Sequence, residues 1–394
     1  MKYNNNLEKS LTKLHTYCNA QGYKGYDPYD TLNSFFPFSK LGSSIPVYAI
    51  QVQKRNPVNI RPLLGIKKDY NPKGLGLFLK AYSILYQIYG DEKYLKQCNE
   101  LYNTLIDLTS KGYSGACWGY NFDWASPGSY LPRYTPSVVV TSFVVDGLIE
   151  YYKIDPSTQI KETIISSGNY IINDLPITKL ENGICFAYTE KSKGCCYNAS
   201  LLGVETLAKI YSINKNSSLL DQARSAVNYV LTQQKPDGSW YYSIDFKTGK
   251  ERRQIDFHQG FVLMSLENYM RYSGDYDSKI ISALKKGLEF YRNEQFKENG
   301  VSKWRLPKEY PIDIHNQAQG IITFAELSKY SNEYLQFAET IAEWSIKNMQ
   351  DAEGYFYYRN YRFYKNKIPF MRWGQDWMLL ALATLLKKKH ENEN

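Results

Sequence analysis

Hydrophobic positions recur along this chain on two scales, within single helices and between copies of a larger unit. Six segments carry apolar residues at the i, i+3, i+4 spacing that is typical of a helix, and they align at Leu85, Leu148, Leu207, Leu266, Phe324 and Leu382. Successive aligned positions lie 63, 59, 59, 58 and 58 residues apart. This regularity predicts a repeated structural unit of about sixty residues.

Each unit is predicted to be a helical hairpin followed by a loop. A more polar helix follows most of the apolar ones, for example over residues 91–111 and 334–350. Loops rich in glycine and aromatic residues, such as GACWGYNFDW (115–124) and DGSWYYSIDF (237–246), then lead to the next apolar helix and indicate short β-hairpin insertions. About six such pairs predict an all-α, closed (α/α)6-type toroid with the apolar helices inside. An open solenoid is the competing arrangement.

We expect residues 1–394 to form one domain, because no linker interrupts the repeats. Residues 1–70 are expected to supply the first helix pair and a long loop that covers the mouth of the toroid, and residues 387–394 a charged tail. The chain has no run of about 18 apolar residues and no leader-like start, so we expect a cytoplasmic protein without a transmembrane segment. Its six cysteines, including the adjacent Cys195 and Cys196, are accordingly expected to be reduced.

Composition and motifs narrow the classes of function that the sequence allows. The net charge of +9 is spread along the chain, which is too diffuse to predict a nucleic-acid partner. Nucleotide-binding and zinc-binding motifs are not found in the sequence, and we expect neither a cofactor nor a required metal. Tyrosine accounts for 37 of the 61 aromatic residues, and its ring with a polar edge favours half-exposed aromatic surfaces. Such rings suit the apolar faces of sugars, although they could instead pack only against one another. Those expected at the site are Trp118, Tyr120, Trp124, Trp240, Tyr241, Trp304, Tyr355, Tyr357 and Trp373.

In a toroid, the aromatic loops all lie at the end where the inner helices begin, so polar side chains at those helix starts meet in one concave site. Counting back six to ten positions from the aligned residues gives Asp256, His258, His315 and Asp376 as catalytic candidates. The same positions give the substrate-binding candidates Tyr197, Asn198, Gln259, Asn316, Gln317, Arg372 and Gln375. Helix capping is the alternative explanation for any single one, but it does not explain two aligned histidines.

The loop WGYNFDW adds a further candidate acid. Asp123 lies between aromatic residues there, and desolvation by rings raises the pKa of a carboxyl group towards that of a general acid. Tyr120 in the same loop is a second candidate proton carrier, whereas an ordinary loop or capping role is the alternative for Asp123. Arg133 either holds a substrate carboxylate or pairs with Asp123. Asp27 and Asp30, in GYDPYD, resemble a pair of site acids, but turn residues around Pro28 are the preferred interpretation.

The segments GYDPYDTLNS, WGYNFDW, HNQAQG and MRWGQDWMLLAL together resemble a prokaryotic family encoded in surface-polysaccharide gene clusters. Members are often labelled delta-aminolevulinic acid dehydratase, but the sequence has no lysine pair in a β/α-barrel pattern to support that label. More distantly, the chain is similar to six-hairpin glycosidases and to the C-terminal domain of glucuronyl C5-epimerases. The resemblance implies a toroid that acts on glycans, and no residue role is transferred from it.

The leading hypothesis is therefore an enzyme that processes an oligosaccharide or polysaccharide by general acid/base chemistry. Hydrolysis needs two carboxylates, for which Asp123 pairs with Asp256 or Asp376. Epimerisation or elimination instead needs Arg133 or Arg372 to hold a carboxylate while a tyrosine or histidine moves the proton. The positive charge favours an acidic sugar. A non-catalytic glycan-binding or scaffold toroid is the alternative, and a metal bound by His258, His315 and an aspartate is a minor one.

Overall fold

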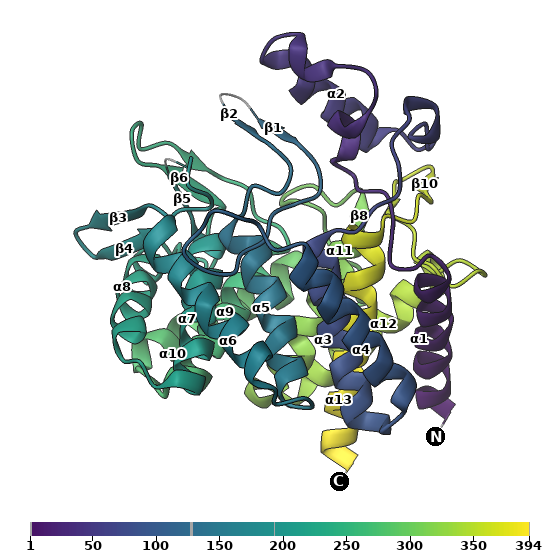
Figure 1. The fold of residues 1–394 in the computed structure, drawn as a ribbon. Coiled ribbons are helices and arrows are strands. Elements are labelled where there is room, and N and C mark those ends of the chain that lie inside the picture. Colours follow the sequence, from purple (N-terminus) through teal and green to yellow (C-terminus); the bar gives the residue numbers. More distant parts are fainter. Residues whose placement is uncertain (1, 127–128, 193, 394) are drawn as a thin grey trace.

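The computed structural model describes residues 2–126, 129–192 and 194–393, and it shows two concentric layers of helices (Figure 1). The inner layer consists of α3 (Pro72–Tyr89), α5 (Val138–Tyr152), α7 (Tyr197–Asn214), α9 (His258–Ser273), α11 (Ile314–Glu326) and α13 (Asp376–Glu393). The outer layer consists of α1 (Lys2–Ala20), α4 (Glu92–Asp107), α6 (Thr158–Asn169), α8 (Ser218–Thr232), α10 (Ser278–Gln295) and α12 (Asn332–Met349).

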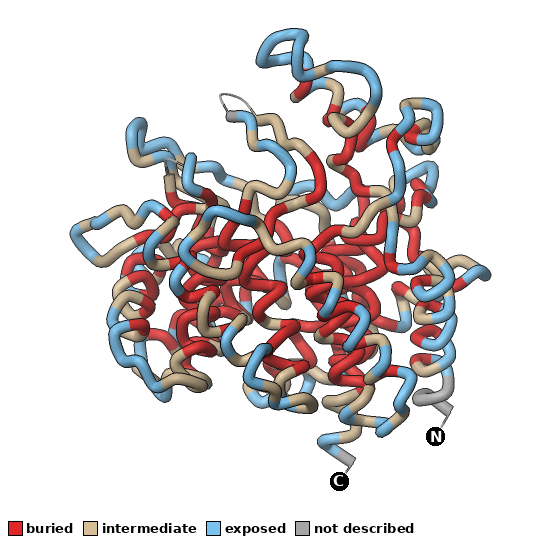
Figure 2. The backbone as a smooth tube through the Cα atoms, viewed as in Figure 1, coloured by how far each residue is buried: buried red, intermediate tan, exposed pale blue. Residues whose placement is uncertain are grey.

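The inner helices close into a ring. Each packs against the next along the chain, and α13 returns to pack against α3. All six residues that align the repeats are completely buried in this inner layer, which is the buried centre of the molecule in Figure 2. The predicted (α/α)6-type toroid is thus confirmed, and the open solenoid is excluded by the contact between α13 and α3.

Local sequence signals place the starts and ends of the inner helices. Asn71 caps α3 by accepting a hydrogen bond from the Lys73 amide, and Pro72 occupies the first helical position. Asp313 caps α11 in the same way through the His315 amide. Gly90 ends α3 in the left-handed conformation that glycine adopts at little cost. The helix starts that carry the candidate site are therefore fixed locally.

The mouth end carries four small antiparallel sheets among the described residues. Two are hairpins, β1 (Trp124–Ser126) with β2 (Ser129–Leu131) and β3 (Ile177–Leu180) with β4 (Gly183–Phe186). The other two sheets join loops of different repeats. One consists of β5 (Gly194–Cys196), β6 (Ser243–Asp245) and β7 (Glu251–Arg252), and the other of β8 (Ile312–Asp313), β9 (Arg359–Asn360) and β10 (Lys365–Asn366).

The two ends of the chain differ from the expected organisation. Residues 1–70 contain one helix of the ring, the outer helix α1, which packs against α12 and α13, and the first inner helix is α3. The rest of this segment includes an arm, residues 34–68, whose helix α2 (Ser44–Arg55) projects above the mouth (Figure 1). Residues 387–393, expected as a tail, extend α13, and ion pairs such as Lys389–Glu339 (2.7 Å) hold them on the ring. Residue 394 lies outside the described residues.

The structure contains a disulfide that the sequence analysis did not expect. Cys185 of β4 and Cys195 of β5 are bonded, with their Cα atoms 6.0 Å apart. The prediction that all cysteines are reduced is therefore wrong for this pair, because the return of the chain after β4 brings together two strands that lie ten residues apart. Cys196 is free and buried. No helix in the described part of the chain is long and apolar enough to cross a membrane.

Candidate functional site

A cavity of about 320 Å³ opens at the mouth, where the inner helices begin. The arm supplies one wall through Val47, Gln51 and Lys54, and the loops after the outer helices supply the others. Beneath it, Phe143, Phe261 and Trp377 pack in a triangle, with ring centroids 5.2 to 5.5 Å apart. These rings separate the mouth cavity from a smaller one of about 40 Å³ further along the ring axis. The site is therefore a pocket closed at its base.

Ten of the residues singled out from the sequence line this cavity. They are Tyr120, Trp124, Asn198, Asp256, His258, Trp304, His315, Asn316, Arg372 and Trp373. They come from five different repeats.

Three glutamines from the same argument have a different place. Gln259, Gln317 and Gln375 each hold the backbone of the preceding aromatic loop with both ends of the side-chain amide. For example, Gln375 Oε1 accepts from the Phe356 amide at 2.7 Å, and its Nε2 donates to the Phe356 carbonyl at 2.8 Å. The hydroxyls of Ser200, one repeat earlier, and Thr141, two repeats earlier, each accept a hydrogen bond from a backbone amide of the preceding loop. These three glutamines, the loop clamps, do not line the cavity.

Two tryptophans and a tyrosine are also part of the scaffold. The Trp118 and Trp240 indoles are completely buried and donate to the carbonyls of Leu105 (2.7 Å) and Val230 (2.9 Å) in the outer helices. Tyr197 is buried and donates to the Gln233 side chain. All three side chains point into the packing between layers and away from the mouth cavity.

Asp123 precedes β1 and Arg133 follows β2, and neither residue lines the cavity. The Asp123 carboxylate accepts hydrogen bonds from the Tyr130 hydroxyl (2.5 Å) and the Arg133 amide (2.7 Å). Arg133 therefore meets Asp123 through its backbone, and its side chain is exposed. The neighbouring Trp124 takes the inward position, stacked on Tyr29 with 4.9 Å between centroids. The sequence analysis expected the rings of this loop to enclose Asp123, and in the structure they do not.

Asp376 is completely buried at the start of α13 and lies behind the cavity wall. One carboxylate oxygen accepts from the Trp377 amide at 2.6 Å, and the other has no partner among the described residues. Burial raises the pKa of Asp376 to about 8. This carboxyl group is therefore protonated at neutral pH.

His258 and Asp256 form a hydrogen-bonded pair on the cavity wall. Nδ1 of His258 lies 2.5 Å from an oxygen of Asp256. The other oxygen accepts from Gln254 (2.6 Å) and lies 3.4 Å from Arg305 Nε. Although burial opposes it, His258 and then Arg305 lower the pKa of Asp256, so the group is a carboxylate. Asp256 thus orients the imidazole and leaves Nε2 as the nitrogen that can exchange a proton.

His315 is the second histidine of the wall, and its surroundings are apolar. It is buried, and neither ring nitrogen has a hydrogen-bond partner among the described residues. Burial, with Lys73 and Arg372 adding to it, holds the pKa of His315 well below its usual range. Its ring stacks on Phe257, which also stacks on His258, with 4.2 Å between centroids in both cases. The site therefore holds a neutral imidazole beside a carboxylate-backed one.

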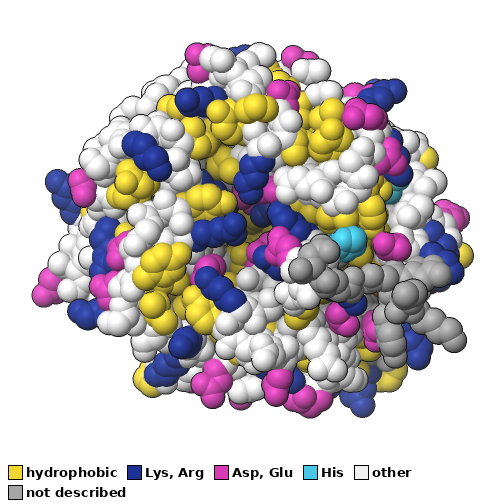
Figure 3. All heavy atoms as spheres, turned by 90° about the horizontal axis from the view of Figure 1, so that it is seen from below, with side chains coloured by type: hydrophobic (Ala, Val, Ile, Leu, Met, Phe, Trp, Pro, Cys, Tyr) yellow, Lys and Arg dark blue, Asp and Glu magenta, His cyan; other side chains and the backbone are white. Residues whose placement is uncertain are grey.

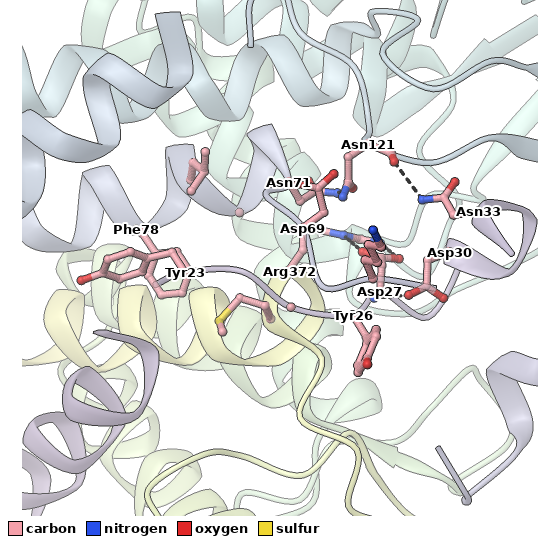
Figure 4. Close-up of a pocket in the computed structure, with 15 residues that line it drawn as sticks. Tyr23, Tyr26, Asp27, Asp30, Asn33, Asp69, Asn71, Phe78, Asn121 and Arg372 are labelled. Carbon is pink, nitrogen blue, oxygen red and sulfur yellow. Dashed lines mark hydrogen bonds and ion pairs between the residues drawn. The ribbon is translucent and has the colours of Figure 1, made fainter. Parts of the chain in front are cut away.

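The cavity wall has more cations than anions. Within the described residues it carries seven lysine or arginine side chains and two carboxylates, Asp256 and Asp313. Arg305 lies near Asp256, and Arg359 binds Asp313 at 2.6 Å. Arg372 is neutralised from behind by Asp27, which accepts from it twice, at 2.6 and 2.7 Å (Figure 4). Four cations of the wall are therefore left without such a partner: Lys54, Arg55, Lys73 and Arg252.

Two of these four, Lys54 and Lys73, are buried. Burial, reinforced by Arg372, lowers the pKa of Lys73 to about 7, and its Nζ lies 4.3 Å from the centroid of Phe143. Burial and the nearby Arg359 and Arg305 likewise lower the pKa of Lys54, whose ammonium group donates to the Tyr29 hydroxyl. A buried ammonium without a counter-ion is costly. The pocket consequently favours an anionic ligand.

The N-terminal aspartates do more than form a turn. Asp27 and Asp30 do accept turn hydrogen bonds, from the amides of Tyr29 and Asp27 (each 2.9 Å). In addition, Asp30 binds Arg61 at 2.7 Å and Asp27 positions Arg372 (Figure 4). Sequence reasoning missed these ion pairs, and it also missed the lining residues Tyr29, Lys54, Lys73, Arg305 and Arg359, which lie outside the repeat positions used for the count.

Several solved structures of other proteins have a fold similar to that of this chain. No family model and no curated protein matches the chain. Among solved structures, a cellobiose 2-epimerase from Bacillus thermoamylovorans has a TM-score of 0.64 at 15% identity, covering 81% of this chain and 88% of that one. An unsaturated glucuronyl hydrolase specific for heparin has a TM-score of 0.65 at 12% identity, covering 100% and 98%. A GH76 α-mannanase from Bacteroides thetaiotaomicron has 0.62 at 12%, covering 82% and 87%.

Proposed function

We propose that the protein is an enzyme that moves a proton at the carbon beside the carboxylate of an acidic sugar, as a uronyl epimerase or a lyase. The observation that carries the proposal is the combination of His258, His315 and the unpaired Lys73 in one pocket that opens at the mouth. The names of two structural neighbours, a sugar epimerase and a glucuronyl hydrolase, agree with this substrate class. The resemblance to surface-polysaccharide clusters makes an oligosaccharide precursor of such a polymer the favoured substrate.

Each group has a chemical task in this mechanism. Lys73 binds the sugar carboxylate, which acidifies the adjacent C–H bond by stabilising the enolate-like charge that develops there. His315, which is neutral, accepts the proton. Because Lys73 lowers the pKa of His315, neutralisation of Lys73 by the substrate raises the basicity of that imidazole. His258, oriented by Asp256, supplies the proton that returns to carbon in an epimerase or goes to the leaving oxygen in a lyase.

Hydrolysis by two carboxylates has less support from the geometry. Asp256 and Asp313, the carboxylates of the described cavity wall, are both occupied, the latter by Arg359 and by the Trp373 indole at 2.8 Å. Asp123 and Asp376 lie outside the wall. No pair of available carboxylates among the described residues therefore flanks the place where a glycosidic bond would lie.

Proton NMR of uronic-acid oligosaccharides in deuterated water tests the proposal. We expect the wild type to introduce deuterium beside the carboxylate, or to form unsaturated sugars, and His258→Gln to lose activity about 100-fold or more, the usual contribution of a general acid. His390→Gln, on the last turn of α13 far from the mouth, is the matched control. New reducing ends without deuterium or unsaturation would instead establish a hydrolase. Signal broadening without any reaction would establish the glycan-binding alternative.

A further inference from the structure

The arm presents an apolar surface to solvent. The described chain exposes fourteen large hydrophobic side chains, and eight of them lie between Phe35 and Leu63. The most exposed in the arm are Phe35, Tyr48, Val52, Val58 and Leu63, with 65 to 79% of each residue accessible. Exposed apolar residues scattered singly need no explanation, but a cluster of this size on one projecting segment indicates an interaction surface.

This surface is the outward face of a helix that is already packed on its other side. In α2, Ile45, Tyr48 and Val52 follow an i, i+3, i+7 spacing and are exposed, whereas Ile50 and Lys54 are buried towards the mouth. The helix contacts β1 and the 3-10 turn at residues 30–33 through that buried side. The exposed face is therefore not needed to hold the arm on the ring.

The charge of the arm identifies the kind of partner. Residues 34–68 contain six lysines or arginines and no aspartate or glutamate, in a chain where acidic residues number 39. Four of the six, Lys40, Arg55, Lys67 and Lys68, are exposed. A second copy of the chain would bring like charges together if the two arms faced each other, which disfavours association. Apolar side chains flanked by cations match a membrane surface containing anionic lipids.

We propose that the arm docks on anionic lipid membranes, with Tyr48, Val52 and Leu63 inserted among the headgroups and the four exposed cations contacting them. Because Gln51 and Lys54 of the same helix line the cavity, docking holds the mouth beside the membrane surface. The inference concerns the arm and stands independently of the reaction proposed above.

Vesicle co-sedimentation tests this inference with the full chain. We expect binding to vesicles of phosphatidylcholine with phosphatidylglycerol, weakening as salt is added, and little binding to phosphatidylcholine alone. Tyr48→Ser with Val52→Ser should weaken binding at least tenfold, since about 0.8 kcal/mol is lost for each methylene no longer buried. Lys40→Gln with Lys67→Gln should weaken it about 30-fold at low salt, at roughly 1 kcal/mol for each cation.

The matched control is Tyr276→Ser, which removes a half-exposed tyrosine between α9 and α10, at the opposite end of the ring. It should bind like the wild type, and all variants should show the same thermal transition. Equal binding to both vesicle types, or unchanged binding of the arm variants, would overturn the proposal. A wild-type dimer in sedimentation velocity that the Tyr48 and Val52 substitutions dissociate would overturn it in favour of self-association.

Discussion

Two lysines on the same helix meet opposite surroundings. Lys73 and Lys80 lie seven residues apart on α3, two turns along one face. Lys80 binds Asp146 at 2.7 Å, which raises the pKa of Lys80 even though burial opposes it. Lys73 forms no ion pair with a carboxylate among the described residues, and burial lowers its pKa to about 7 although Asp376 and Asp27 oppose this. At the end of the ring opposite the mouth, here called the closed end, buried lysines are thus paired with carboxylates of the protein. At the mouth, buried lysines lack such pairs, and a bound ligand would have to neutralise them.

The network at the closed end is complete in a way that the mouth is not. Lys209 bonds to both Asp146 and Glu205, and Glu205 also accepts from Ser265 (2.9 Å) and Asn268 (2.7 Å). On the molecular face seen from that end, basic and acidic side chains are interspersed (Figure 3). The paired charges at the closed end stabilise the fold, whereas the unpaired cations at the mouth are those that the proposed function uses to bind the ligand.

Breaking the balanced end should have the largest effect on stability. Lys209→Met leaves Asp146 and Glu205 with one cationic partner fewer in a buried site. We expect the free energy of unfolding to fall by about 3–5 kcal/mol, as when one member of a buried ion pair is removed. Urea unfolding measures this, and sugar binding by the folded fraction should stay as in the wild type. A loss below about 1 kcal/mol would show that the network is solvated.

The same substitution at the mouth should act in the opposite direction. Lys73→Met removes an unpaired buried cation, and we expect a gain in unfolding free energy on the order of 2 kcal/mol together with loss of affinity for acidic sugars. The folded pKa of about 7 lies below the unfolded value of 10.5, so the unfolded chain binds more protons between these values and wild-type stability rises with pH there. The gain should therefore be largest below pH 7 and fade above it. Destabilisation by Lys73→Met in urea melts would contradict the proposed imbalance.

A purely pH-dependent effect should come from Asp376. Its folded pKa of about 8 exceeds the ordinary aspartate value of 3.8, so the folded protein holds a proton that the unfolded chain releases. Stability from this group is complete below pH 3.8 and is lost as pH rises through 8, by about 1 kcal/mol for each pH unit between these limits. Asp376→Asn keeps a neutral side chain and should remove this slope. Parallel urea melts of both proteins across the window measure the difference, and equal slopes would count against a buried neutral carboxyl.

The fold was predictable because it is repetitive, and the same repetition misdirected part of the site prediction. Leu85, Leu148 and their counterparts mark the ring because every repeat must bury the same surface. A side chain that recurs at equivalent positions has the same structural duty in each repeat, as Gln259, Gln317 and Gln375 show. A single active site breaks the symmetry, so its residues, such as Lys73, need not follow the period.

Other features depend on contacts that no local pattern reveals. Asp27 and Arg372 lie 345 positions apart and meet only because the ring closes. Lys54 reaches the cavity from an arm that belongs to no repeat, and the Cys185–Cys195 bond depends on how the chain returns after β4. Long-range closure and irregular insertions therefore set the limit of the sequence analysis.

The loop clamps also separate the shape of the mouth from the integrity of the ring. Each clamp fixes its loop through main-chain atoms, as in the paired hydrogen bonds of Gln259 to Trp240, so the loop residues beyond that point can vary without disturbing the helices. A loop from another toroid, grafted at the clamped position, would be held by the same glutamine side chain of this protein. The ring can in this sense carry different loops at the same anchoring positions, so that ligand specificity can change one repeat at a time.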